Sequence, residues 1–174
     1  RDHGPKMNNN NEISCVFSPC RKYRYVWRIK TNCVSKIPGS TVSFIGLNPS
    51  TADEVGPDNT VRRCIDYATR WGFDYYVMLN LFGYRATDPK DMKAVNEPIG
   101  DDNDFWIKSY AKTSDLIVAA WGVHGEYRNR GNDVIDLVHG TEGILMCLGK
   151  TKHGYPRHPL YLKKDAELIQ LTTR

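Results

Sequence analysis

Apolar residues along this chain fall into short continuous runs, separated by stretches with helical spacing. Four runs rich in β-branched and large apolar residues predict buried strands at residues 41–46, 75–81, 115–121 and 143–148. An earlier segment, residues 23–30, alternates aromatic or apolar residues with basic ones and predicts a half-buried leading strand.

The segments between the strands show the periodicity of amphipathic helices. Apolar residues recur at helical spacing from Val61 to Ala68, where Asp58 or Asn59 is expected to cap the helix and Gly72 to end it. Further helices are predicted at residues 101–113 and 127–138.

Alternating strands and helices, with strands that are apolar throughout, are typical of a parallel sheet covered on both faces. We therefore expect an α/β fold, a three-layer α/β/α domain with a central parallel sheet of about four strands, plus the leading strand, which looks antiparallel. Ligands bind such sheets beyond the carboxyl ends of the strands. The four segments at those ends are rich in Gly, Pro, Asn, His and Arg, and read GLNPSTAD, NLFGYRATDP, WGVHG and GKTKHGYPRHPLYL. They are predicted to outline one site.

Length and composition suit a single globular domain. With 174 residues, 40% hydrophobic and 25% charged, residues 23–174 are expected to form one domain. Residues 1–22 are expected to be a polar N-terminal segment, partly disordered or carried over from cloning. No membrane-spanning run or secretory signal is visible, so a cytoplasmic monomer without membrane contact is expected.

The five cysteines are odd in number and scattered, which favours a reducing compartment over a disulfide framework. Cys15, Cys20 and Cys33 lie near one another in the chain and raise the alternative of a metal or iron–sulfur site. No CxxC pair is present, however, so free thiols are favoured. We expect no metal and no cofactor.

The net charge of +4 permits nucleic-acid binding without requiring it. Residues 150–164 carry five basic residues and no acidic one, which indicates either a phosphate-binding surface or a solvated basic face. The candidate phosphate contacts are Arg85, Lys150, Lys152 and Arg157. Arg62 and Arg63, near a helix start, are expected to be structural or solvated.

Three motifs in order resemble the uracil-DNA glycosylase superfamily. GLNPS, residues 46–50, follows a buried strand and resembles its first motif, whereas HPLYL, residues 158–162, resembles its second. Between them, VMLNLFGYRATDP resembles the strand that ends in a base-reading Asn and the loop after it. The whole pattern is also similar to a family catalogued as a domain of unknown function. The resemblance covers residues 41–162.

This resemblance implies hydrolysis of an N-glycosidic bond, a reaction in which water attacks an oxocarbenium-like sugar. Asn48 would orient that water but cannot take its proton, so a general-base factor of roughly 10²–10⁴ would be missing. His158 would donate a hydrogen bond to the departing base, an interaction worth about 3–4 kcal/mol. Asn48 can instead close its own turn, and a histidine beside a proline is a common loop residue.

The resemblance also implies the residues that would hold the base. Asn80 would read the base edge through its amide, or alternatively cap the turn after its strand. Phe82 is a candidate for stacking on an extruded base, as are Tyr84 and Trp121, although large aromatics near strand ends usually belong to the core. The remaining motif residues that would line the base or the nucleic-acid backbone are Gly46, Leu47, Pro49, Ser50 and Pro159. Tyr161 and Leu162 resemble the part of the second motif that enters the duplex.

Asp53 is a further catalytic candidate because it would supply the carboxylate that Asn48 lacks. The alternative is that Asp53 and Asp58 bind a divalent ion, although Asp58 is better explained as a helix cap. Ser50 stands where the most efficient uracil-removing enzymes carry an aromatic residue, and the four-cysteine cluster of the iron–sulfur branch is not reproduced. The expected function is a monofunctional DNA glycosylase that removes a damaged or modified pyrimidine from single- or double-stranded DNA, in repair or modified-base removal. The alternatives are an N-glycosidase of free modified nucleosides or nucleotides, and a catalytically silent nucleic-acid-binding module.

Overall fold

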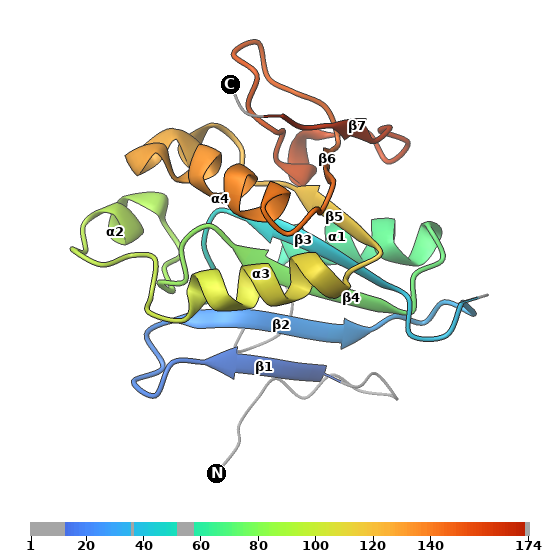
Figure 1. The fold of residues 1–174 in the computed structure, drawn as a ribbon, viewed down its shortest axis with the longest axis horizontal. Coiled ribbons are helices and arrows are strands. Elements are labelled where there is room, and N and C mark those ends of the chain that lie inside the picture. Colours follow the sequence, from blue (N-terminus) through green and yellow to red (C-terminus); the bar gives the residue numbers. More distant parts are fainter. Residues whose placement is uncertain (1–12, 36, 52–57, 173–174) are drawn as a thin grey trace.

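In a computed structural model, residues 13–35, 37–51 and 58–172 are described, and they form one mixed sheet with helices on both faces (Figure 1). The sheet has seven strands in the order β1-β2-β4-β3-β5-β6-β7. Their bounds are β1 Ile13–Phe17, β2 Arg24–Lys30, β3 Thr41–Gly46, β4 Tyr75–Asn80, β5 Leu116–Ala119, β6 Leu145–Cys147 and β7 Ile169–Gln170.

The central part of the sheet consists of the four predicted parallel strands, β4, β3, β5 and β6. The predicted leading strand, β2, runs antiparallel to β4, as expected. The sheet is nevertheless larger than the expected four or so strands and the leading strand, because β1 and β7 add an antiparallel strand at each edge. The sequences of β1 and β7, ISCVF and IQ, show no clear alternation of apolar and polar residues. Each of these edge strands is defined by its pairing with one neighbouring strand, which a local sequence pattern does not reveal. β1 lies within residues 1–22, the polar N-terminal segment that was expected to be partly disordered.

The helices are α1 Asn59–Arg70, α2 Pro89–Lys93, α3 Asn103–Thr113 and α4 Arg130–His139, with 3-10 turns η2 Val123–Asn129 and η3 Pro159–Tyr161. Asp58 caps α1 by accepting from the Val61 N–H at 2.9 Å, as predicted. The helix predicted from residue 127 begins instead at Arg130, because Arg128 and Asn129 have positive φ values of 54° and 56°. None of the helices in the described ranges has both the length and the apolar character needed to cross a membrane.

Two clusters of buried apolar residues fill the space between the sheet and the helices on either face. On one face of the sheet, Val61, Cys64 and Tyr67 of α1 pack against Phe44 and Tyr76. On the other, residues of α3 and α4 pack against alternate residues of the same strands. Figure 1 shows α3 and α4 on one side of the sheet and α1 on the other. The chain is therefore a three-layer α/β/α domain, and the covered strands direct their carboxyl ends to one edge.

Candidate functional site

A cavity of about 840 Å³ lies at the carboxyl ends of the parallel strands, which is within the range of small-molecule sites. All four predicted loops contribute to its wall, together with the first turn of α1. The lining residues from β3, β4 and their loops are Gly46, Leu47, Asn48, Pro49, Ser50, Met78, Asn80, Ala86, Thr87 and Pro89. The remaining lining residues are Arg24, Asp58, Asn59, Thr60, Val61, Trp121, Gly122, Val123, His124, Thr151, Lys152, Arg157, His158, Leu160 and Tyr161.

The topology explains why the cavity forms there. β3 occupies the middle of the parallel strands, with β4 on one side and β5 on the other. The chain leaves β3 in one direction for β4 and later crosses to β5, so the loops after β3 and β5 diverge. Open α/β sheets bind ligands in the crevice at such a switch point. The expected convergence of the four loops is therefore confirmed.

Asn48 has its two amide atoms in different roles. The Nδ2 group donates to the backbone oxygen of Ala86 at 2.9 Å and to that of Pro49 at 3.2 Å. Carbonyl oxygens only accept, so the amino group must face them, and Oδ1 is left as the other end of the amide. No hydrogen bond reaches this Oδ1 from the described residues, and Asn48 lines the cavity. Asn48 thus fastens two loops together and offers an acceptor to a ligand or water.

His158 shows a similar division. Its Nδ1 accepts from the Leu160 N–H at 3.3 Å and so caps the 3-10 turn η3. Burial lowers the pKa of His158, whereas the carboxylate of Asp58 partly opposes this shift. The imidazole is therefore neutral at neutral pH, and because Nδ1 accepts, the proton lies on Nε2. His158 provides an N–H donor in the cavity wall.

Asn80 is 1% exposed, and within the described part of the chain neither its Oδ1 nor its Nδ2 has a hydrogen-bond partner. A buried amide without partners is costly, so such a group in a cavity wall indicates a site for a ligand or ordered water. Gly46 makes room for it, because an added Cβ at Gly46 would lie 2.9 Å from Asn80 Oδ1 and 2.6 Å from Met78 Cε.

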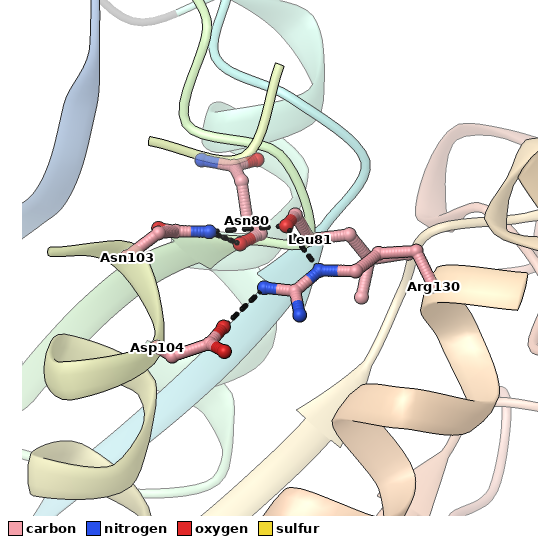
Figure 2. Close-up of polar contacts among 5 residues, drawn as sticks. All are labelled: Asn80, Leu81, Asn103, Asp104 and Arg130. Atoms are coloured by element: carbon pink, nitrogen blue, oxygen red, sulfur yellow. Dashed lines mark hydrogen bonds and ion pairs between the residues drawn. The ribbon is translucent and has the colours of Figure 1, made fainter. Parts of the chain in front are cut away.

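A network of hydrogen bonds and one ion pair fixes the backbone beneath Asn80 (Figure 2). The Nδ2 of Asn103 donates to the backbone oxygens of Asn80 at 2.9 Å and Leu81 at 3.0 Å. Arg130 donates from Nε to the same Leu81 oxygen at 2.9 Å and pairs with Asp104 at 2.5 Å. Figure 2 shows the Asn80 side chain directed away from this network. The network therefore holds the end of β4 and leaves the amide of Asn80 to the cavity.

The cavity does not include all the residues predicted for the site. Phe82 is fully buried and packs on Tyr127 with ring centroids 5.7 Å apart, so its ring belongs to the core and is not available to stack on a base. Arg85 donates to the Arg21 backbone oxygen, beside the β1–β2 turn, and does not line the cavity. Lys150 and the buried Pro159 also lie outside the lining.

Other candidates lie in or near the cavity wall. Lys152 and Arg157 are exposed residues of the wall, and Tyr161 is 82% exposed beside them. Trp121 lines the cavity but is almost fully buried. Arg63 donates to the Leu162 backbone oxygen, which agrees with the structural role expected for it. Asp53 lies outside the described residues.

Arg24 lines the cavity and was missed by the sequence analysis. The alternating pattern of residues 23–30 places Arg24 with the outward-facing basic residues, but the pairing of β1 with β2 contains a bulge. Val16 pairs with Val26, whereas the next residue, Phe17, pairs with Arg24. A bulge reverses the alternation of side chains. As a result Arg24 stacks on Trp27, 4.8 Å from its ring centroid, on the α1 side of the sheet.

No metal centre is evident in the described ranges, since no three His, Cys, Asp or Glu side chains gather there as ligands. Cys15, Cys20 and Cys33 are free thiols.

Comparison with known proteins yields one match. No curated protein and no solved structure matches the chain. The matching family spans residues 24–160, a range that begins at Arg24, ends within η3 and contains nearly all of the cavity lining. The chain belongs to this family, which is described as Protein of unknown function (DUF1643).

Proposed function

We propose that the protein hydrolyses the N-glycosidic bond of a modified pyrimidine in DNA and leaves an abasic site. The observation that carries this proposal is the placement of Asn48, Asn80 and His158 in the wall of one cavity, with a polar atom of each left without a partner among the described residues. These groups supply an acceptor, a paired donor and acceptor, and a donor. A pyrimidine and its attacking water need this set.

The reaction needs two kinds of assistance. As the bond to the base breaks, positive charge develops on the sugar and negative charge on the base. The free Oδ1 of Asn48 holds the attacking water, and the Nε2–H of His158 donates to a base carbonyl oxygen as its charge grows. A neutral donor suits this role because it stabilises the anionic base without itself giving up a proton.

Asn80 provides recognition. Its amide presents a donor and an acceptor side by side, which matches the imide edge of a uracil-like ring. A ligand that pairs with both atoms removes the desolvation penalty of the buried amide, and a ligand that pairs with only one does not. The site therefore discriminates between bases by hydrogen bonding as well as by shape.

The rim of the cavity favours a polymeric substrate. Lys152 and Arg157 are exposed there, and Leu160 and Tyr161 are exposed apolar residues of the same wall. Cationic and aromatic side chains beside a pocket are the features that bind a nucleic-acid strand and hold an extruded base. Binding through these cations should weaken steeply with salt.

The test is an abasic-site assay on single- and double-stranded oligonucleotides that carry uracil, hydroxymethyluracil, hypoxanthine or bulky modified pyrimidines. The informative variant is His158→Asn, because asparagine retains an acceptor for the Leu160 N–H but lacks the Nε2 donor. It should fold like the wild type and lose about 100-fold or more in rate. Asn48→Ala should also lose activity, and His153→Ala, an exposed residue outside the cavity, is the matched control.

The outcomes separate the alternatives. If His158→Asn and Asn48→Ala cleave as fast as the wild type, the assignment of the site is wrong. Hydrolysis of free nucleosides or nucleotides without cleavage of DNA would indicate an N-glycosidase of small substrates. Salt-sensitive DNA binding with neither activity would indicate a binding module.

A further inference from the structure

A buried cation, Arg24, lies in the wall of the same cavity as Asn80. Arg24 is the first residue of β2, and its N–H donates to the Gly83 oxygen at 2.9 Å. This bond places it next to the segment that follows β4. The side chain is 3% exposed and lines the same cavity as Asn48 and His158.

Arg24 keeps its charge in this position. Burial lowers the pKa of Arg24 to about 10, which still leaves the guanidinium protonated at neutral pH. Among the described residues, the cavity wall contains one carboxylate that could offset this charge, that of Asp58. Its Oδ1 accepts from the Val61 N–H, and it affects the pKa of Arg24 less than Cys15, Tyr76 or Arg85 does. A positive charge is therefore placed at a poorly solvated part of the wall.

The neighbouring groups add donors. Met78 and Asn80 both face the α1 side of the sheet, because they alternate with residues that pack against α3 and α4. Arg24 lies on this side as well, through the bulge opposite Phe17. Asn80 Nδ2 brings N–H groups without a partner in the described chain, and the guanidinium of Arg24 adds N–H donors to the same cavity wall.

We infer that this part of the cavity binds an oxyanion, a carboxylate or phosphate of the ligand, with Arg24 as the residue that determines specificity. Guanidinium groups bind both anions through paired N–H donors, and the low solvent access strengthens the interaction. The inference rests on the proposed function for the pyrimidine nature of the ligand. The oxyanion is then either an acidic substituent of the base or the phosphate of a nucleotide.

Binding measurements test the inference without requiring catalysis. The three probes are 2′-deoxyuridine, its 5-carboxy derivative and its 5′-monophosphate, titrated calorimetrically against the wild type. At least one anionic probe should bind about tenfold or more tightly than the neutral nucleoside, as expected for hydrogen bonds to a charged group. Preference for the carboxy derivative identifies the base substituent as the source, and preference for the monophosphate identifies a nucleotide phosphate.

The variants assign the effect to Arg24. Arg24→Met should remove the preference for the anionic probe, whereas Arg24→Lys should retain part of it. Arg28→Met is the matched control, because Arg28 belongs to the same strand and stacks on Tyr75 at 3.7 Å but does not line the cavity. Thermal melting establishes that each variant is folded, and if Arg24→Met does not fold, Arg24→Lys decides.

The inference is overturned if the wild type binds the neutral and anionic probes equally or binds none of them. It is also overturned if every folded Arg24 variant keeps the full preference. Arg24-dependent binding of an anion without cleavage of any substrate would support this inference while removing the proposed function, so the two can fail separately.

Discussion

Replacing Asn80 with leucine should stabilise the protein while it abolishes ligand recognition. The two side chains are similar in shape, but leucine has no polar atoms to desolvate. Asn80 is 1% exposed, and neither amide atom is hydrogen-bonded within the described chain. If Asn80 served instead to cap the turn after β4, the same substitution would remove a stabilising hydrogen bond, so the sign of the change distinguishes the two roles.

The magnitude follows from the cost of an unpaired amide. Mutational data place that cost at about 1–3 kcal/mol, and water in the cavity recovers part of it, so we expect a gain of about 1–2 kcal/mol. For a chain of this size the gain corresponds to a rise in Tm of about 2–8 °C. Chemical denaturation and thermal melting of the ligand-free protein measure it.

Asn103 is the matched control, because it is also a fully buried asparagine. Its Nδ2 bonds to the backbone oxygens of Asn80 and Leu81, although its Oδ1 has no partner in the described residues. Asn103→Leu should therefore destabilise the protein by about 1–2 kcal/mol, opposite in sign to Asn80→Leu. A loss of 1 kcal/mol or more in Asn80→Leu would refute the assignment of Asn80 to ligand binding.

Three further changes test the cavity wall. Burial lowers the pKa of His158, so the unfolded chain binds a proton at a higher pH than the folded protein does. The stabilising contribution should be complete above about pH 6.5 and should be lost as the pH falls through the pKa of His158 in the folded protein. Denaturation at about pH 7.5 and about pH 5 should therefore show a smaller loss of stability in His158→Gln than in the wild type. Asn48→Asp would place a carboxylate oxygen against the Ala86 carbonyl, so we expect a loss of about 1–3 kcal/mol in denaturation and no faster reaction in the abasic-site assay. Gly46→Ala would push Asn80 and Met78 aside, which should cost about 1–3 kcal/mol and weaken ligand binding by calorimetry; unchanged affinity would contradict this.

The central fold could be predicted from the sequence because its signals are local and redundant. The run at residues 41–46 forms β3 with the same bounds, and Asp58 caps α1 as expected. Strands covered on both faces must be apolar throughout, so the apolar runs predicted a parallel sheet. The parallel sheet in turn predicted that the loops would converge at the carboxyl ends of its strands. The position of the cavity followed from the order of the strands rather than from any single motif.

Features that depend on tertiary pairing could not be predicted in this way. Arg24 follows an alternating pattern, but a bulge set by the pairing of β1 with β2 turns it to the cavity side. Phe82 lies two residues beyond the end of β4, and its ring enters the core instead of the cavity. In both cases the direction of one side chain depends on how the backbone pairs with a distant segment, through a bulge for Arg24 and through the bond from the Phe82 N–H to the Leu47 oxygen for Phe82.

The cavity wall also shows why structural and chemical roles of a residue need not compete. Asn48 was expected either to close its turn or to orient water, and His158 to be either a loop residue or a donor. In each, one polar atom fastens a loop, through Ala86 or Leu160, while the other is left for the cavity. The fastening fixes which atom faces inward, because an amide that donates to a carbonyl must turn its oxygen away and an imidazole that accepts at Nδ1 must carry its proton on Nε2. The hydrogen bond that fastens the loop is therefore what orients the atom that faces the cavity. A substitution that removes only the cavity-facing atom separates the two roles, whereas substitution by alanine removes both.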